Sequence, residues 1–271
     1  MKQFQVIVND KRITYFDTQT SGLPVILIHG TSLSSVIFIR QLIDPSLSEI
    51  FRFIALDLPG CGDSEWSKNP EKEYSIKALA AVLGGFCEKL NLSSSVFVGH
   101  NFGGNILLEA LKNLPLAKAI SLVCSVPLTN PITPGMFLSH EAVPLLSKAG
   151  IGDRDIHQIA ASLVEPEAKY PEFLPQIMQK SDIKYREVFF KSLNEGAFSD
   201  QYSILKELKI PVALFLGGKD QLINPDYVKN FAIPQLWHKN ILTIKDAGHL
   251  CFYENPADFN TTLKGFLNEI V

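Results

Sequence analysis

A glycine-rich turn is the first place in the sequence where residue types and spacing indicate chemistry. The segment SSSVFVGHNFGGN leads from an apolar run (95–98) through Gly99-His100-Asn101-Phe102-Gly103-Gly104 into a helical run. Small residues two positions before and after Asn101 suit a strained turn that lifts its central side chain above a sheet. The helix N-terminus behind that turn offers backbone N–H groups to a developing oxyanion. We predict that Asn101 occupies a nucleophile position; a glycine-rich junction with only a packing role is the alternative.

Two later motifs supply a carboxylate and an imidazole. Asp220 lies in FLGGKDQLINP, just past the apolar run 211–216, and His249 lies in the loop of TIKDAGHLCFYENPADF. A carboxylate in this place orients and stabilises a histidine that acts as general base. The run near Ile120 ends in CSVP without a carboxylate, so the usual competing position for the acid is empty. A turn aspartate and a solvated histidine are the alternatives, but nucleophile, acid and histidine each directly follow a predicted strand, in that order.

A fourth motif predicts the oxyanion site. In ILIHGTS, His29-Gly30 ends an apolar run and Thr31 follows it. The loop after this run can bring the Thr31 N–H opposite Asn101, where it joins the Phe102 N–H in holding one oxygen. We interpret His29 itself as structural, because it ends a buried strand. Cys251 is a thiol close to His249, but no motif places it on the nucleophile turn.

Short apolar runs and helical spacing alternate along the chain and predict the elements that position these residues. A hairpin is expected around Asn9-Asp10, and the strands expected after it are PVILI (24–28), FRFIAL (51–56), SVFV (95–98), AISLV (119–123), PVALFL (211–216) and NILTI (240–244). Helices are expected over 75–90, 105–114 and 256–270. Alternating strands and helices predict a doubly wound, mostly parallel α/β sheet.

One interval lacks strand-like runs. From residue 130 to 205 the chain offers helical pieces punctuated by prolines. Because a structureless loop of that length is improbable in a compact domain, we predict a helical cap over 130–205, with the α/β core formed by 1–129 and 206–271. Apolar cap residues are candidates for an acyl pocket, although such residues more often pack a cap onto its core; they are Phe137, Leu138, Leu145, Leu146, Phe173, Met178, Phe189 and Phe190.

Composition limits the classes of partner. The net charge of −3 and the absence of a long basic run argue against nucleic-acid binding. The N-terminal residues lack a secretory signal, and no apolar run is long enough to cross a bilayer, so we expect a cytoplasmic location. The four cysteines, at 61, 87, 124 and 251, form no C-x-x-C pair, so we expect reduced thiols and no metal site. The oligomeric state is not indicated by the sequence.

The signatures LIHGTS, DLPGCGDS, VGHNFGG, GGKD and DAGHLCFYENPADF together resemble those of the α/β-hydrolase superfamily across nearly the whole chain. IHGTSLSSVIF followed by DLPGCGDS is most similar to capped esterases and lactonases, including acyl-homoserine lactonases. The resemblance implies an eight-stranded, mostly parallel sheet, a lid, no cofactor, and a triad at Asn101, Asp220 and His249. It also implies a small-molecule substrate with an apolar acyl part.

The departure from the family lies at Asn101, because family members carry Ser there, or Asp in the dehalogenase and epoxide-hydrolase branches. An amide nitrogen has its lone pair delocalised and has no proton that His249 can remove near neutral pH. Three accounts stay open: an inactivated form of a serine hydrolase, a natural non-catalytic binding relative, and an Asn that deamidates to a competent Asp. We expect an ester or lactone hydrolase that is strongly impaired as written.

Overall fold

The computed structural model describes residues 1–92, 94–148 and 150–271. Ser93, which opens the nucleophile motif, and Ala149, inside the expected cap, lie outside the described residues. Eight strands form one sheet in the order β1-β2-β4-β3-β5-β6-β7-β8. The strands are β1 (Lys2–Val8), β2 (Lys11–Asp17), β3 (Pro24–Ile28), β4 (Arg52–Leu56), β5 (Val96–His100), β6 (Ala119–Val123), β7 (Val212–Gly217) and β8 (Leu242–Ile244).

The direction of the strands follows from their connections. β1 and β2 form an antiparallel hairpin, and Asn9 and Asp10 at its turn have φ of 50° and 62°, which a two-residue turn with the twist of the strands requires. β2 is also antiparallel to β4, and all remaining pairs are parallel. Every residue of β6 is buried, as expected for a strand covered on both faces. The eight-stranded, mostly parallel sheet predicted from the sequence is therefore confirmed.

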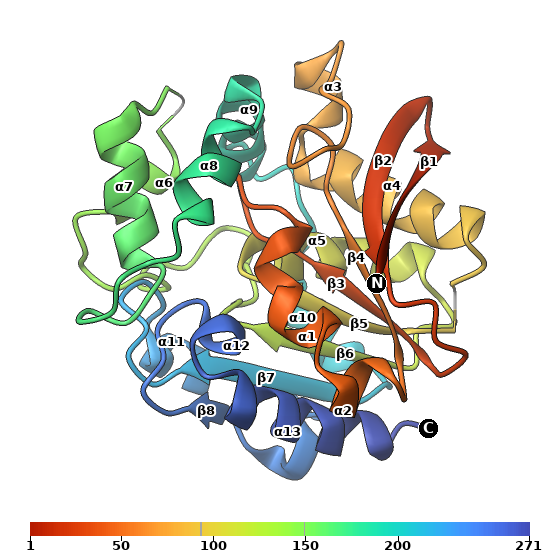
Figure 1. Cartoon of the computed structure of the whole chain (residues 1–271). Coiled ribbons are helices and arrows are strands. Elements are labelled where there is room, and N and C mark those ends of the chain that lie inside the picture. Colours follow the sequence, from red (N-terminus) through yellow and green to blue (C-terminus); the bar gives the residue numbers. More distant parts are fainter. Residues whose placement is uncertain (93, 149) are drawn as a thin grey trace.

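Helices cover both faces of the sheet (Figure 1). One face carries helices that contact one another, namely α1 (Ile39–Leu42), α2 (Pro45–Ser48), α12 (Cys251–Glu254) and α13 (Pro256–Asn268). The other face carries α4 (Ile76–Lys89), α5 (Phe102–Ala110) and α10 (Gln201–Glu207). Side chains cap the longest of them: Ser75 accepts a hydrogen bond from the Ala78 amide and Asn255 from the Asp258 amide. Shorter elements are η1 (Ser35–Phe38), α3 (Pro70–Glu73), η2 (Leu111–Asn113), α11 (Pro225–Lys229) and η3 (Trp237–Lys239).

The helix expected over 105–114 is displaced in the structure. It begins at Phe102 and ends at Ala110, and a single 3-10 turn, η2, follows it. The prediction from helical spacing begins three residues later, because the spacing of apolar residues does not include Gly103 and Gly104. Both are helical here, since the first turn of α5 packs directly on the backbone of β3 and leaves no room for a side chain on Gly103.

The described residues between β6 and β7 form five helices: α6 (Val143–Leu146), α7 (Asp153–Ser162), α8 (Phe173–Gln179), α9 (Ile183–Asn194) and α10. We call this segment the helical insertion. In Figure 1, α6 to α9 stand together at one end of the sheet, on the opposite side of the picture from most of α13 and the C-terminus. α10 runs to Glu207, two residues past the cap boundary expected from the sequence. No helix of the described residues has the length and apolar character needed to cross a membrane.

Candidate active site

Asn101 occupies a strained turn between β5 and α5. Its φ is 52° and its ψ is −130°, a conformation that non-glycine residues adopt rarely and at an energetic cost. Glycines make the turn possible on both sides. A Cβ on Gly103 would lie 2.4 Å from the Ile28 carbonyl oxygen, and a Cβ on Gly99 would lie 2.5 Å from the Gly104 Cα. The glycine spacing around Asn101 is therefore a packing requirement of the strand–turn–helix.

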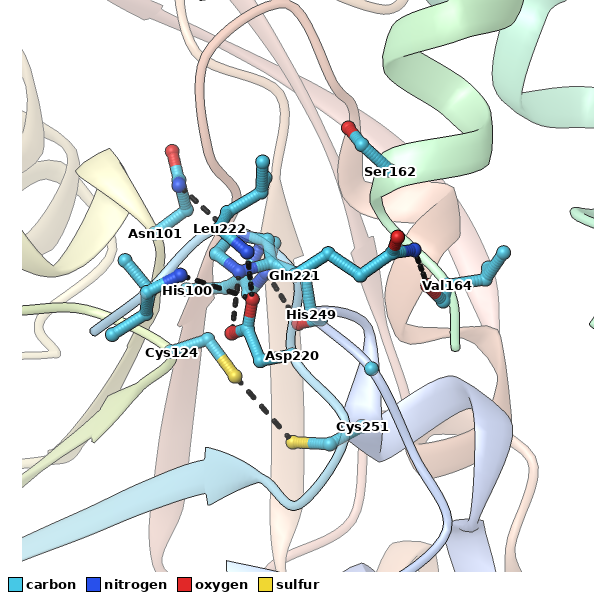
Figure 2. A network of polar contacts seen from close by, with 12 residues as sticks. His100, Asn101, Cys124, Ser162, Val164, Asp220, Gln221, Leu222, His249 and Cys251 are labelled. Carbon is cyan, nitrogen blue, oxygen red and sulfur yellow. Dashed lines mark hydrogen bonds and ion pairs between the residues drawn. The ribbon is translucent and has the colours of Figure 1, made fainter. Parts of the chain in front are cut away.

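Three side chains from separate loops meet at this turn (Figure 2). The Asn101 Nδ2 lies 2.9 Å from His249 Nε2, and His249 Nδ1 lies 2.8 Å from Asp220 Oδ2. Because an amide nitrogen only donates, His249 Nε2 is the acceptor and His249 Nδ1 carries the proton that Asp220 accepts. The imidazole is thus held in the tautomer that a general base requires.

Asp220 is held in place by its own loop. Its Oδ1 accepts hydrogen bonds from the amides of Leu222 and Ile223, at 2.8 and 3.1 Å, while Oδ2 faces His249. Burial raises the pKa of Asp220, but the charge of His249 and the hydrogen bonds from His249 and the two amides outweigh it, so the pKa is lowered overall. The carboxylate is therefore ionised at neutral pH and can stabilise a protonated His249.

His100 contacts His249 through a hydrogen bond and through its ring. His100 Nε2 donates to the His249 carbonyl oxygen at 3.1 Å, and the two imidazole rings are 4.9 Å apart. Burial, and then the charge of His249, lower the pKa of His100 well below its ordinary value. His100 is therefore neutral at neutral pH. The sequence does not indicate this role, because only the fold brings His100 against the His249 loop.

The opposite side of Asn101 consists of the loop after β3 and the start of α5. Gly30 approaches so closely that a Cβ there would lie 2.8 Å from the Asn101 Cβ. Neither the Thr31 nor the Phe102 amide donates a hydrogen bond to another group in the described part of the chain. The Thr31 hydroxyl is also buried without a partner there. His29 fixes this loop, since its Nδ1 donates to the Gly30 carbonyl at 2.7 Å and its Nε2 accepts from the Leu58 amide at 2.9 Å.

A narrow cavity of about 20 Å³ lies against Asn101, Thr31 and Phe102. Three of the cap residues expected to line an acyl pocket form part of its wall: Leu146, Met178 and Phe190. Leu33, Ile159, Leu163, Leu222 and Arg186 complete it, and no sequence motif marks these five residues. Apolar composition alone does not distinguish side chains that line a cavity from side chains that pack the insertion onto the core.

The other expected cap residues have different roles. Phe137 borders a second crevice on the other side of Asn101, together with Ser125 and Val126. Phe189 packs edge-on against the ring of Phe102, with the centroids 5.2 Å apart. Phe189 therefore packs the helical insertion onto the start of α5, which is the alternative role considered for these apolar residues.

One group of side chains in the described residues has the geometry of a metal site. The ligand atoms of Cys124, Asp220 and His249 lie within 4.8 Å of one another. Each of them already has a partner, because Asp220 and His249 bind each other and the Cys124 sulfur lies 3.9 Å from that of Cys251. Burial raises the pKa of Cys124 well above its ordinary value, which disfavours the thiolate that a metal needs. We assign no metal to this cluster.

Known proteins share the fold of this chain. Residues 24–148 match the family model described as alpha/beta hydrolase fold. A solved structure of N-acyl homoserine lactonase AidH, a mutant complexed with N-hexanoyl homoserine lactone, superposes with a TM-score of 0.95 at 25% identity, covering 100% of this chain and 99% of that chain. The chain belongs to the α/β-hydrolase superfamily.

Sequence relatives of this α/β-hydrolase are hydrolases of more than one kind. "Lipase 1" of Psychrobacter immobilis is 26% identical over 275 residues, which cover 98% of this chain and 83% of the lipase. "Bifunctional epoxide hydrolase 2" of Sus scrofa is 39% identical over 92 residues, which cover 33% of this chain and 16% of that protein. The superfamily predicted from the sequence motifs is therefore confirmed, while the relatives do not agree on one substrate.

Proposed function

We propose that this α/β-hydrolase is a carboxylic-ester or lactone hydrolase whose covalent step is interrupted by Asn101. The observation that carries the proposal is the continuous contact from Asn101 Nδ2 through His249 to Asp220, at 2.9 and 2.8 Å. An acid–base pair aligned on a strained strand–turn–helix is the machinery of acyl transfer. In this proposal Asn101, Asp220 and His249 are the catalytic positions, and the Thr31 and Phe102 amides form the oxyanion site.

The chemistry at this site depends on what stands at position 101. With a serine there, His249 Nε2 would take the hydroxyl proton as the oxygen bonds to the substrate carbonyl carbon. The carbonyl oxygen would become an oxyanion held by the Thr31 and Phe102 amides, and His249 would return the proton to the departing alcohol. Water would then release the acid by the same steps. This route requires no cofactor.

Asn101 stops the first of these steps. Its amide nitrogen already donates to His249 Nε2, the atom that must accept a proton, and has no free lone pair for attack. Loss of a nucleophile costs about 10⁶ in turnover in a well-studied triad protease. Binding and the oxyanion site alone retain roughly 10³ to 10⁴ over water. As written, the chain therefore binds its substrate and hydrolyses it slowly.

The walls of the site support an acyl ligand under a cap. Leu146, Ile159 and Phe190 present apolar surface beside Asn101, and all three come from the helical insertion. We assign residues 130–205 as a cap that covers the site between two parts of an α/β core. The AidH structure with N-hexanoyl homoserine lactone has nearly the same fold, which supports an acylated lactone or ester as ligand. The cavity must widen to admit such a molecule.

The test is to restore the nucleophile. The Asn101→Ser protein is expected to hydrolyse short acyl esters or lactones at least about 10³-fold faster than the unaltered chain, because only the nucleophile is missing. Adding His249→Ala is expected to abolish that gain. A panel of esters, lactones and thioesters measures both. Failure of Asn101→Ser to hydrolyse any member of the panel would refute the proposal and favour a role in binding alone.

A second candidate is an enzyme with an Asp nucleophile, formed by deamidation of Asn101. The segment similar to the epoxide hydrolase of Sus scrofa gives this some support. The three tyrosines of the insertion do not support it, because each has another contact. Tyr170 hydrogen-bonds to His157, Tyr202 packs on Phe231, and Tyr185 lies buried between other aromatic rings. None of the three lines the cavities that contact Asn101.

Intact-mass measurement after long incubation decides this second candidate. Deamidation converts the amide to a carboxylate and raises the mass by about 1 Da, and peptide mapping assigns the change to position 101. Asn105 is a matched internal control, since its amide is buried and donates to Val126 and Gln201. We expect no change at either position. A gain of mass confined to Asn101 would replace the ester-hydrolase proposal with the Asp-nucleophile one.

A further inference from the structure

Arg186 is a buried cation in the wall of the Asn101 cavity. It lies on α9, its residue is 4% exposed, and it borders the cavity together with Thr31 and Asn101. Among the described residues that form this wall, Arg186 alone is charged. In the described part of the chain its hydrogen-bond partners are neutral oxygens, not carboxylates. A buried charge without a counter-ion is costly unless something compensates it.

Its donors are not all used. Nη2 donates to the Leu145 and Leu146 carbonyls at 2.8 and 2.5 Å, Nη1 to the Ser32 hydroxyl at 3.2 Å, and Nε weakly to the Lys148 carbonyl at 3.4 Å. A guanidinium has five N–H groups, so one N–H on Nη1 has no acceptor among the described residues. Nη1 is also the nitrogen directed at the loop that follows β3.

The neutral partners compensate the charge only in part. Leu145 and Leu146 belong to α6, a single turn of four residues whose dipole is correspondingly small. Burial lowers the pKa of Arg186 to about 10, so the group keeps its proton at neutral pH. Asp182, which caps the N-terminus of α9, is engaged elsewhere, by the Tyr74 hydroxyl at 2.7 Å and the Lys184 amide at 3.0 Å.

Arg186 also borders two cavities. With Met178 it borders both the Asn101 cavity and a neighbouring cavity of about 180 Å³, whose rim includes Ile183, 65% exposed. Ser32 and Asp182 line this second cavity as well. The guanidinium is therefore part of the wall that a ligand meets in either cavity.

We infer that Arg186 forms an anion subsite and that the preferred substrate is an ester or lactone whose acyl part carries a carboxylate. The substrate carbonyl lies at Thr31 and Phe102, and the carboxylate accepts the free Nη1 hydrogen and neutralises the buried charge. This inference rests on the proposed function. It gives the site a selectivity that apolar walls alone do not supply, because a carboxylate is poorly accommodated in a cavity without a cation.

Two esters of equal chain length test the subsite in the Asn101→Ser protein. Mono-para-nitrophenyl glutarate and para-nitrophenyl pentanoate differ only in the terminal carboxylate. We expect kcat/KM to favour the glutarate, and Arg186→Gln to reduce this preference about tenfold or more, chiefly through KM, as for a lost hydrogen bond to a charged group. Arg186→Lys is expected to restore part of the preference. Arg154→Gln, an exposed cation on α7, is the matched control and should leave it unchanged.

A purely structural role for Arg186 predicts a different result. If the residue only fastens α6 to the loop after β3, Arg186→Gln lowers the rates of both esters equally, and that outcome overturns the inference. The inference is also overturned if the Asn101→Ser protein shows no preference for the glutarate. Ser32→Ala is a second variant, for the case that Arg186→Gln does not fold. It removes the hydroxyl that accepts from Arg186 Nη1 but leaves the hydrogen bonds from Nη2 to α6 in place. This variant should retain the glutarate preference, and losing it would contradict the subsite.

Calorimetry on the unaltered chain separates this inference from the proposed function. Monomethyl glutarate is expected to bind more tightly than methyl pentanoate, and Arg186→Gln to remove the difference. This holds even if Asn101→Ser hydrolyses nothing, in which case the proposed function fails and the subsite stands. Equal affinity for both ligands refutes the subsite whatever the hydrolysis result.

Discussion

The two sides of Asn101 differ in how completely their polar groups are paired. On one side, the carboxamide, His249 and Asp220 satisfy one another in sequence, and the Asp220 loop contributes two further amides. On the other side, the amides of Thr31 and Phe102 have no acceptor in the described residues, and the Thr31 hydroxyl is buried without a partner.

This difference separates two functions of a hydrolase site. In the proposed function, the paired side is the acid–base relay, and Asn101 completes its hydrogen bonding while removing its reactivity. The unpaired side has donors on residues that line a cavity, which is the arrangement expected for binding a carbonyl oxygen. Buried donors without partners cost free energy, so their retention favours a ligand that satisfies them. The comparison predicts a protein that has kept its recognition of acyl groups and lost its nucleophile.

The largest expected effect comes from breaking the relay in the Asn101→Ser background. Asp220→Asn is expected to lower kcat about 10⁴-fold, because the amide no longer holds the productive histidine tautomer. Ester hydrolysis under saturating substrate measures it. Asp226→Asn on α11 is a matched control, since that carboxylate is exposed and pairs only locally with Lys229. A loss smaller than about tenfold for Asp220→Asn would mean that another group orients His249.

A stability effect is expected from disturbing the oxyanion side. Gly103→Ala places a Cβ 2.4 Å from the Ile28 carbonyl oxygen and 2.5 Å from that of His29, both fixed backbone atoms. The start of α5 must move, which we expect to cost about 2–3 kcal/mol of unfolding free energy and to displace the Phe102 amide. Urea unfolding measures the cost. Gly150→Ala, with open space around its position, is the control, and equal stability of the two variants would contradict the close packing.

The smallest expected effect is a change in how stability depends on pH. Burial lowers the pKa of His100 in the folded state, so below its ordinary pKa of about 6.5 the unfolded chain takes up a proton that the folded chain refuses. Stability therefore falls as the pH falls from about 6.5 toward the folded pKa, by up to about 1.4 kcal/mol per pH unit. His100→Phe is expected to remove this part of the slope in urea titrations from about pH 7.5 to 5.

The remaining slope provides the control for this prediction. Burial also lowers the pKa of His29, so His29 contributes in the same direction and its share persists in the His100→Phe protein. The lost hydrogen bond to the His249 carbonyl lowers stability equally at every pH. An unchanged slope in the variant would show that His100 does not stay neutral in the folded protein.

The sequence predicts the sheet and the meeting of Asn101, Asp220 and His249 for a local reason. Each residue directly follows a predicted strand, and parallel strands bring their carboxyl ends to one edge of the sheet. The sequence does not predict His100 or Arg186, whose significance depends on contacts with the His249 loop and with Ser32, more than 140 residues away in each case. The sequence also does not predict that α5 begins at Phe102, because packing on β3 imposes the helical conformation of Gly103.

The central claim is that only the nucleophile is missing from an otherwise assembled site, and a fluorophosphonate probe tests it most directly. Such probes bond to a serine oxygen only when a base and an oxyanion site activate it. Intact-mass spectrometry is expected to show one adduct on the Asn101→Ser protein, and none on the unaltered chain or after adding His249→Ala. A correctly folded Asn101→Ser protein that takes up no probe would contradict the account.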